Sequence, residues 1–484
     1  MKTWEWATSL VGSETIATLS SVSPWQWAAG LIGGTTAAVI AYISLKPEKV
    51  VIIKAKENPW WSATPPELAN FDTSIRPFTV YVEQDVLDDL KARLNNVRNY
   101  RSMPGWDYGT QSQYLLPIIE YWKNEYDWRK QEKILNSFDQ FKTNISGLDI
   151  HFIHAKPKSD AQTNSLPVKV VLLIHGWPGS VFEFHKAIPM LNEQGYTVVA
   201  PSLPGFGFSD APEVSGLGPI ETASIFAKLI NRLGYEKYYV QGGDWGAAIA
   251  SDIAKIDTRH CRGIHINFVT TMAPNPIYTY GVGSIFPSWV FPDPEERKRH
   301  LPVLARIMDF VHEASYFIIQ STRPDTPGFA LNDSPIGLAA WILEKFVRWS
   351  GCAYEEDYTA CMEEKFTRDE LITNIMIYWV TQSIMTSMRF YKECLVNDMD
   401  AGKAEVLLPV GIADFPYEMA RPPRRWVRHQ YKQIITYNTM PDGGHFAALE
   451  KPNLLIPDFL QFVAKTEELY AQKKINIPPA VDPM

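Results

Sequence analysis

Residues 238–250 of the chain read Tyr-Tyr-Val-Gln-Gly-Gly-Asp-Trp-Gly-Ala-Ala-Ile-Ala, with Asp244 at the centre of a group of glycines. An apolar run that passes through glycines into alanines predicts a strand, a tight turn and the start of a helix. An aspartate at such a junction is more often a helix N-cap, but an N-cap needs no small neighbours. A strained turn that presents one side chain does need them, because its strand and helix approach closely. The stretch therefore predicts a nucleophile elbow that holds a carboxylate where serine is usual.

Short apolar strands and helical stretches alternate on both sides of this elbow. The apolar run 168–174 shows no polar alternation, which suits a parallel strand covered on both faces. The alternation predicts an α/β fold with a doubly wound, mostly parallel sheet. The expected strands are 148–154, 168–174, 196–200, 238–240, 263–268, 406–412 and 434–437, followed by a final helix at about 454–471.

The alternation stops between residues 271 and 400, where aromatic residues and helix formers dominate. A helical insertion between two blocks of strands predicts a lid over the carboxyl ends of the strands, where open α/β sheets bind ligands. Residues 79–140 also show helical periodicity. The expected organisation is an N-terminal segment at 1–47, a helical N-terminal region at 48–147, the two parts of the α/β core at 148–270 and 401–484, and the lid at 271–400.

Residues 25–45 form an uncharged stretch of 21 residues, long enough to span a bilayer as a helix. A signal peptide and a buried core helix are the alternatives. Glu5 and Glu14 precede the stretch, whereas a signal peptide begins with a basic region. Four lysines follow the stretch by residue 56 and one precedes it, so the positive-inside rule places the C-terminal part in the cytosol. We therefore expect a single-pass transmembrane anchor, and on the cytosolic side the glycosylation sequon at Asn144 would stay unused.

The composition argues against several other classes of protein. A net charge of −8 over 484 residues makes nucleic acid an unfavourable partner. The chain contains neither a dinucleotide-binding glycine loop nor a G-x-x-x-x-G-K phosphate loop. Its cysteines show neither metal-type pairing nor dense spacing, and we expect free thiols in a reducing compartment at Cys261, Cys352, Cys361 and Cys394.

A glycine- and proline-rich loop, His-Gly-Trp-Pro-Gly-Ser at 175–180, follows directly on the strand that ends at Ile174. Such loops make ordinary turns. In hydrolases with a nucleophile elbow, however, the loop at this place supplies one backbone N–H of an oxyanion hole, and the residue after the nucleophile supplies the other. On that interpretation the two donors are the N–H groups of Trp177 and Trp245.

A histidine and two carboxylates follow the late strands. His445 lies in the glycine-rich loop between the last strand and the last helix, where this architecture carries its general base, although a lone histidine is more often structural. The order nucleophile, acid, histidine along the chain fits the same architecture. Strand 406–412 is followed by Asp414 and Glu418. Asp414 is nearer the strand and Glu418 has the longer reach, so spacing alone does not decide which is the acid.

Five segments together resemble the microsomal epoxide hydrolases, including the insect juvenile-hormone epoxide hydrolases: HGWPGS, GGDWGA, NDSPIGLAAWILEKF, FPYE and GGHFAALEKP. The resemblance extends over essentially the whole chain. It implies an α/β-hydrolase fold with a helical lid, an anchor in the endoplasmic reticulum membrane and a catalytic domain facing the cytosol. It also implies these roles: Asp244 as nucleophile, His445 as base, Glu418 of the F-P-x-E stretch as charge-relay acid, and Tyr316 and Tyr391 as proton donors in the lid.

A carboxylate nucleophile suits epoxide chemistry. Its attack on an ester would give an unproductive anhydride, whereas its attack on a strained carbon–oxygen bond gives an ordinary ester. Water activated by His445 can then cleave that ester at its acyl carbon, with the oxyanion hole holding the charge. A phenol can protonate the opening ring. The expected product is a vicinal diol, and the reaction needs neither a metal nor an organic cofactor.

Two other functions compete with this interpretation. A haloalkane dehalogenase also follows its nucleophilic aspartate with tryptophan, but it needs N–H donors for a halide rather than Tyr316 and Tyr391. A non-catalytic lipid-binding protein on a hydrolase fold would not need the full set of catalytic groups. The sequence leaves open whether the natural substrate is a xenobiotic epoxide, juvenile hormone or a fatty-acid epoxide. It also leaves the oligomeric state open, although Gly30 and Gly34 form a G-x-x-x-G pair that often aids helix packing.

Overall fold

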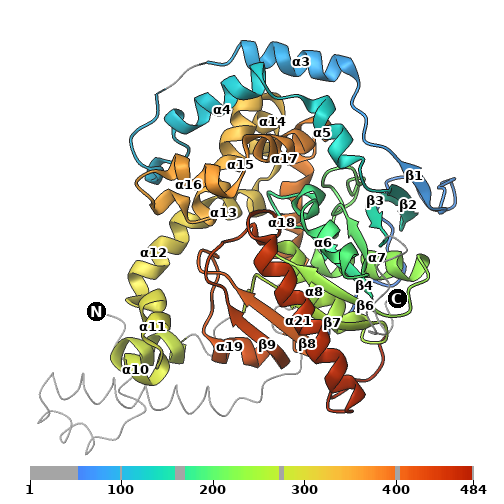
Figure 1. The fold of residues 1–484 in the computed structure, drawn as a ribbon, viewed down its shortest axis with the longest axis vertical. Coiled ribbons are helices and arrows are strands. Elements are labelled where there is room, and N and C mark those ends of the chain that lie inside the picture. The colour runs from blue at the N-terminus through green and yellow to red at the C-terminus, as the bar shows by residue number, and fades with distance from the viewer. Residues whose placement is uncertain (1–52, 99–100, 158–168, 272–276, 398–403, 482–484) are drawn as a thin grey trace, which may run out of the picture. The chain divides into compact units, whose positions relative to one another are not determined.

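The computed structural model describes residues 53–98, 101–157, 169–271, 277–397 and 404–481. Within these residues, nine strands form one sheet in the order β1-β2-β3-β5-β4-β6-β7-β8-β9 (Figure 1). The pairs from β1 to β5 are antiparallel and the pairs from β5 to β9 are parallel, which confirms the predicted mostly parallel sheet. The strands are β1 (Arg76–Phe78), β2 (Gln140–Ile145), β3 (Leu148–Ala155), β4 (Val170–Ile174), β5 (Thr197–Pro201), β6 (Tyr238–Gly242), β7 (Cys261–Ile266), β8 (Val406–Asp414) and β9 (Tyr431–Thr439).

Helices surround this sheet and fill the insertion between β7 and β8 (Figure 1). Before the insertion they are α3 (Gln84–Asn95), η1 (Trp106–Tyr108), α4 (Ser112–Asn124), α5 (Trp128–Leu135), η3 (Val181–Phe184), α6 (Ala187–Glu193), α7 (Pro219–Arg232) and α8 (Trp245–Ile256). Within the insertion they include α12 (Val303–Glu313), α13 (Ser315–Thr322), α14 (Asp325–Asp333), α15 (Pro335–Trp349), η5 (Cys352–Tyr354), α16 (Tyr358–Lys365), α17 (Arg368–Thr381) and α18 (Ile384–Asn397). After it come α19 (Arg424–Gln430), α20 (Ala447–Glu450) and α21 (Pro452–Ala471).

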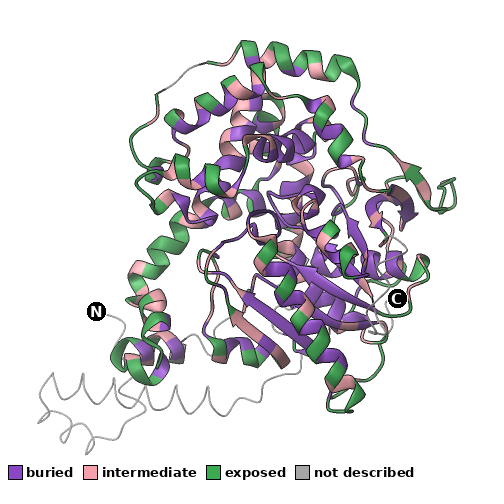
Figure 2. Ribbon diagram, in the orientation of Figure 1, coloured by how far each residue is buried: buried purple, intermediate pink, exposed green. Residues whose placement is uncertain are grey.

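Side-chain alternation along the strands gives the sheet two buried faces. Figure 2 shows the central strands coloured as buried. In β4, Val171 and Leu173 belong to one apolar cluster, whereas Leu172 and Ile174 belong to the other. Helices α7 and α8 pack on one face, and α6 and α21 pack on the other. Because both faces are covered, the central strands tolerate continuous apolar sequence, and the carboxyl ends of the strands remain as the place for a site.

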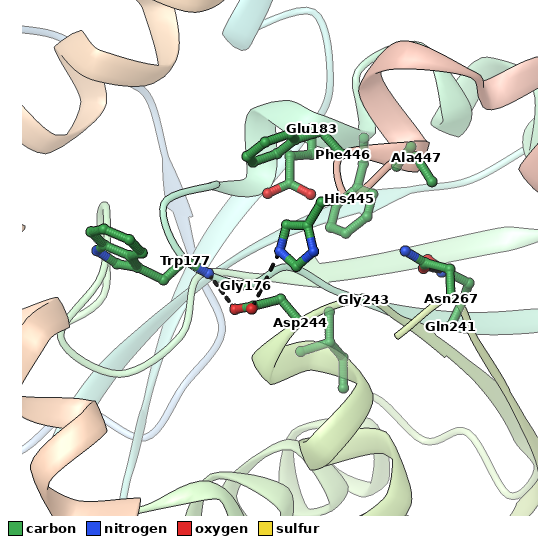
Figure 3. Close-up of a pocket in the computed structure, with 13 residues that line it drawn as sticks. Gly176, Trp177, Glu183, Gln241, Gly243, Asp244, Asn267, His445, Phe446 and Ala447 are labelled. Atoms are coloured by element: carbon green, nitrogen blue, oxygen red, sulfur yellow. Dashed lines mark hydrogen bonds and ion pairs between the residues drawn. The ribbon is translucent and has the colours of Figure 1, made fainter. Parts of the chain in front are cut away.

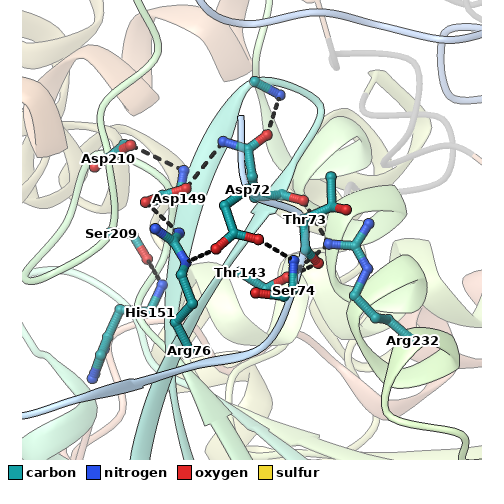
Figure 4. A network of polar contacts seen from close by, with 12 residues as sticks. Asp72, Thr73, Ser74, Arg76, Thr143, Asp149, His151, Ser209, Asp210 and Arg232 are labelled. Carbon is teal, nitrogen blue, oxygen red and sulfur yellow. Dashed lines mark hydrogen bonds and ion pairs between the residues drawn. The ribbon is translucent and has the colours of Figure 1, made fainter. Parts of the chain in front are cut away.

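The antiparallel extension formed by β1 and β2 was not predicted from the sequence. Arg76 of β1 donates a hydrogen bond to Asp149 of β3 at 2.6 Å, and the hydroxyl of Thr143 donates to the Thr73 carbonyl at 2.9 Å (Figure 4). The guanidinium of Arg232 in α7 donates in turn to the Thr143 hydroxyl at 2.8 Å. These polar contacts add to the core packing of Phe78, Phe141 and Ile145, and hydrophobic periodicity does not report them.

Helix α17 in the insertion fixes the loop that follows β4. The amide of Asn374 donates to the carbonyl of Pro178, and the hydroxyl of Tyr378 donates to the carbonyl of Gly179, each at 2.6 Å. The hydroxyl of Ser180 donates back to Asn374 at 2.9 Å. A helix of the insertion thus positions the backbone of the loop expected to supply an oxyanion-hole donor.

The expectation of free thiols is wrong for two of the four cysteines. Cys352 and Cys361 form a disulfide, with their Cα atoms 5.6 Å apart. Cys352 begins η5, three positions after the end of α15, and Cys361 lies in α16, so the bond closes the turn between these helices. The spacing of nine residues carries no signal by itself; packing of the two helices brings the side chains together.

The chain divides into two units. Residues 51–272 and 298–484 form the larger one, and 1–50 with 273–297 form the smaller one. Described elements of the smaller unit are η4 (Ile277–Val282), α9 (Gly283–Ile285), α10 (Pro287–Val290) and most of α11 (Pro294–His300).

The predicted anchor at 25–45, with its G-x-x-x-G pair, lies outside the described residues and stays a prediction. Across the described ranges, no helix combines the length and apolar character needed to cross a bilayer. Asn144 of the sequon is 2% exposed within β2, where its amide donates to Asp149 at 3.0 Å. Its side chain is therefore inaccessible in the folded chain, whichever side of a membrane the protein occupies.

Candidate active site

The turn between β6 and α8 has the strained geometry of a nucleophile elbow. Asp244 adopts φ 51° and ψ −127°, a backbone conformation rare for residues other than glycine. A Cβ atom at Gly242 would collide with the carbonyl of Gly246, and one at Gly246 would collide with the carbonyl of Ile174. The glycines that flank Asp244 are thus required by the close approach of strand and helix. The Asp244 side chain makes no helix-capping hydrogen bond, so the N-cap interpretation does not apply.

Each oxygen of the Asp244 carboxylate contacts a residue that the sequence had predicted to belong to the site. The backbone N–H of Trp177 donates to Oδ1 at 2.8 Å, and Oδ2 lies 3.3 Å from Nε2 of His445 (Figure 3). The loop after β4, the elbow after β6 and the loop after β9 supply these three residues. They meet because parallel strands end at one edge of the sheet.

His445 is held on its other side by Glu418. Nδ1 of the imidazole lies 2.7 Å from Oε1 of Glu418, and the two residues are 5% and 6% exposed. Asp414, the other predicted candidate for the acid, instead makes a two-pronged contact with Arg421, with distances of 2.6 and 2.9 Å. The geometry thus favours Glu418 as the partner of the histidine.

Charge around His445 favours its protonated form. Burial opposes a charged imidazolium, but the carboxylates of Glu418 and Asp244 outweigh this effect and raise the pKa of His445 well above its usual value. The free site therefore holds an imidazolium between two carboxylates. Removal of either negative charge would lower the pKa of the ring and release a base.

Tyr316 of α13 and Tyr391 of α18 come together in the same buried cluster. Their rings are 5.9 Å apart, and the Trp177 ring packs against both, at 5.4 Å from Tyr316 and 5.7 Å from Tyr391. Burial raises the pKa of each phenol well above its usual value, and the charge of Asp244 adds to the effect. Both phenols are therefore protonated.

The predicted second oxyanion-hole donor is the N–H of Trp245, the first residue of α8. An N–H in the first turn of a helix has no acceptor within the helix, so it is available for an anion. The indole of Trp245 packs edge-on against Tyr391, with ring centroids 4.8 Å apart. This contact joins the elbow to the lid helix that carries one of the two phenols.

Two further carboxyl groups at the site carried no expectation from the sequence. Glu450 of α20 accepts from the N–H groups of Gly444 and Phe446, at 2.9 and 3.1 Å, and so fixes the backbone on both sides of His445. Glu183 of η3 lines a cavity beside Asp244 (Figure 3). Glu450 ends α20 and Glu183 lies within η3, and neither position carries a local sequence signal for a residue of the site.

The described residues contain no group of three or more histidine, cysteine, aspartate or glutamate side chains placed to bind a metal ion. The groups gathered at the carboxyl edge of the sheet are a carboxylate on a strained turn, an imidazole with its carboxylate partner, a backbone N–H donor and two phenols. This set can form and break a covalent ester and can protonate a leaving oxygen.

Comparisons with known proteins place these residues in a family context. Residues 75–184 match the epoxide hydrolase N terminus family, and residues 169–407 match the alpha/beta hydrolase fold family. Epoxide hydrolase 1 of Oryctolagus cuniculus is 41% identical over 426 residues, which cover 85% of this chain and 93% of the relative. Juvenile hormone epoxide hydrolase 2 of Ctenocephalides felis is 39% identical over 427 residues, covering 86% of this chain and 90% of the relative.

Solved structures give the same result. The crystal structure of juvenile hormone epoxide hydrolase from the silkworm Bombyx mori superposes with a TM-score of 0.79 at 38% identity, covering 85% of this chain and 99% of that protein. Aspergillus niger epoxide hydrolase gives a TM-score of 0.68 at 28% identity, covering 82% of this chain and 99% of that protein.

Proposed function

The chain belongs to the epoxide hydrolase family and is an epoxide hydrolase, and we propose that it converts lipophilic epoxides to vicinal diols through a covalent ester on Asp244. The observation that carries the proposal is the contact of the Asp244 carboxylate with both His445 and the Trp177 N–H, in a cluster that also buries two phenols. A carboxylate in this setting can act as nucleophile, and the ester it forms lies within reach of a base.

In the first step, an oxygen of Asp244 attacks a ring carbon of the epoxide. The bond between that carbon and the ring oxygen breaks, and the ring oxygen takes a proton from Tyr316 or Tyr391. Burial keeps both phenols protonated, so each has a proton to give. An alkoxide is more basic than a phenolate, which keeps the transfer favourable despite the raised pKa of the phenols.

Formation of the ester changes the protonation of His445. The Asp244 charge that helps to raise the pKa of the imidazole is lost when Asp244 becomes an ester. The imidazolium then gives up its proton, which restores the phenol, and the neutral ring becomes a base for water. Glu418 steadies the imidazolium that forms again when water is deprotonated.

We also propose that the enzyme is anchored in the endoplasmic reticulum membrane by residues 25–45. The absence of charge over this stretch and the lysines that follow it support the proposal. Relatives named for juvenile hormone and relatives without that name match at 39% and 41% identity, so sequence similarity does not separate xenobiotic detoxification from turnover of hormone or lipid epoxides. A competition assay among xenobiotic, juvenile-hormone and fatty-acid epoxides addresses that choice.

A single turnover in ¹⁸O-water, with enzyme in excess over styrene oxide, tests the mechanism. If Asp244 attacks the substrate, the oxygen added to the first diol comes from the carboxylate. The diol is then unlabelled and the heavy oxygen stays in the protein. Direct attack by water, with Asp244 as a base, would label the first diol fully and overturn the proposal.

A further inference from the structure

A small polar cavity borders Asp244 and His445 (Figure 3). The centre of a water molecule has about 20 Å³ to occupy in it, and roughly 10–15 Å³ suffices for one water molecule with polar partners. Beside the catalytic pair, its lining includes the polar side chains of Glu183, Gln241 and Asn267. The cavity thus has both the room and the polar groups that a bound water molecule requires.

The carboxyl group of Glu183 occupies a position that the preceding loop creates. A Cβ atom at Gly179 would coincide with Oε1 of Glu183, so only glycine leaves room for the carboxyl group there. The backbone N–H of Ser180 donates a hydrogen bond to the same carboxyl. Figure 3 shows the carboxyl group pointing toward the imidazole of His445. The second glycine of the loop at 175–180 therefore serves to aim Glu183 into the site.

The two amides that line the cavity are engaged with each other. Nε2 of Gln241 donates to Oδ1 of Asn267 at 2.9 Å, and both side chains are buried. Glu183, in contrast, interacts electrostatically with both Asp244 and His445. Among the three lining side chains, it is Glu183 that faces both the atom to be attacked and the base that activates the attacker.

We propose that Glu183 binds and orients the water molecule that cleaves the ester, an inference that rests on the ester mechanism given above. A carboxyl oxygen of Glu183 accepts one hydrogen of the water, and Nε2 of His445 accepts the other. The lone pair of the water oxygen is thereby turned toward Cγ of Asp244. Glu183 thus acts in the second step of the reaction and not in the first.

Ester hydrolysis adds water at Cγ of Asp244 and releases the substrate oxygen. His445 takes one proton from the water, and the hydroxide oxygen bonds to Cγ of the ester, which places a negative charge on the carbonyl oxygen beside the Trp177 N–H. The bond from Cγ to the substrate oxygen then breaks, and that oxygen leaves as an alcohol with the proton from His445. Asp244 is left as a carboxylic acid, and its proton returns to His445 to restore the carboxylate and the imidazolium.

The protonation state of Glu183 is compatible with this role. Burial raises the pKa of its carboxyl to about 8, and the charge of Asp244 adds to the rise while that of His445 opposes it. A neutral carboxyl group adds no second negative charge beside the nucleophile in the free enzyme. Its oxygen accepts a hydrogen bond from water in either protonation state.

Single-turnover kinetics with styrene oxide test the proposal, with ester followed by intact-protein mass and diol followed after rapid quenching. Glu183→Met keeps the side-chain volume but removes the acceptor, and we expect ester hydrolysis to slow about 10–100-fold with ester formation changed only a few-fold. Glu183→Gln keeps an acceptor oxygen and is expected to hydrolyse the ester within a few-fold of wild type. Gly179→Ala displaces the carboxyl group without removing it, and should slow hydrolysis as Glu183→Met does.

The results distinguish a failure of the Asp244 ester mechanism from a failure of the proposed role of Glu183. His445→Gln, as reference, should accumulate the ester. If no variant shows an ester, the proposed mechanism fails. If His445→Gln accumulates ester but Glu183→Met hydrolyses it at the wild-type rate, or loses both steps equally, the role of Glu183 is overturned. Should Glu183→Met fail to fold, a Glu183→Gln enzyme that hydrolyses normally and a Gly179→Ala enzyme that does not would still support the inference, and any other pair of results would reject it.

Discussion

Nδ1 of His445 lies 2.7 Å from Oε1 of Glu418, although Asp414 stands nearer to the end of β8. Asp414 is occupied by Arg421, which contacts both of its oxygens. Because Arg421 already pairs with Asp414, Glu418 is the carboxylate that remains to pair with His445. Substitutions of Glu418 and Asp414 should therefore have different effects.

Glu418→Gln should slow ester hydrolysis by about 10²–10⁴ while ester formation falls less, because the lost charge stabilises the imidazolium that forms in the second step. Asp414→Asn should leave both rate constants within a few-fold of wild type, and should instead lower stability by about 1–3 kcal/mol through loss of a partly buried ion pair. Rapid-quench kinetics and thermal melting measure the two effects. The reverse pattern would identify Asp414 as the working acid.

The lid phenols should share the protonation of the epoxide oxygen. Tyr316→Phe and Tyr391→Phe should each retain partial activity, because the other phenol remains beside Trp177. The double variant should lose about 10²–10⁴ in the rate of ester formation, the usual contribution of a positioned general acid. A double variant within a few-fold of wild type would contradict the assignment, and turnover of a haloalkane would then become the reaction to test.

Local sequence predicted the parts of the site whose geometry is set by neighbouring residues. Gly242 and Gly246 leave room for the close approach of α8 to β6 and β4, and the place of His445 follows from strand order. The sequence could not identify whether Asp414 or Glu418 pairs with His445, because the answer depends on the position of the Arg421 side chain.

Three further features depend on contacts that no local pattern reports. β2 reads Gln-Phe-Lys-Thr-Asn-Ile, and polar contacts and antiparallel pairing support it beside the core contacts of Phe141 and Ile145. The disulfide between Cys352 and Cys361 depends on how η5 and α16 pack after α15. Glu183 comes to the site because Gly179, four positions earlier, leaves room for its carboxyl group.

Removal of the disulfide should lower stability more than it alters chemistry. Closure of a loop with a separation of nine residues is worth roughly 2–3 kcal/mol in the chain-entropy model. The double variant Cys352→Ser/Cys361→Ser should therefore melt several degrees lower, with kcat changed only a few-fold. The disulfide lies shortly after Trp349, whose carbonyl accepts a hydrogen bond from the N–H of His445 at 3.0 Å. A large loss of kcat would therefore show that the disulfide also positions His445.

The predicted anchor and the disulfide favour opposite sides of a membrane. Lysines after residues 25–45 place the catalytic part in the cytosol, whereas disulfides persist mainly in oxidising compartments. Full-length protein should remain in the membrane pellet after a carbonate wash, and deletion of 1–47 should release active enzyme into the supernatant. Protease digestion of intact microsomes should degrade the catalytic part if it faces the cytosol. Protection that disappears with detergent would place it in the lumen instead.

The stability of the enzyme should fall as pH rises through the range in which Glu183 ionises. Burial raises the pKa of this carboxyl from 4.5 to about 8, so between these values the folded chain holds a proton that the unfolded chain has released. The contribution of Glu183 to stability is therefore fully present below pH 4.5 and is lost as pH rises through about 8. One pKa unit corresponds to about 1.4 kcal/mol, and because the side chain borders a cavity that admits water, we expect a loss of a few kcal/mol at most.

Glu183→Gln removes this titration while it keeps the volume of the side chain. Its melting temperature should fall less than that of wild type between pH ~5 and pH ~8.5, because the amide has no proton to lose. The charges that face Glu183, on Asp244 and His445, are present in both proteins, so their own titration largely cancels in the comparison. Glu450, whose pKa burial raises to about 7, contributes in the same direction to both curves. Parallel curves for the two proteins would show that Glu183 is already ionised in the folded enzyme, and the neutral carboxyl described for the free site would then be wrong.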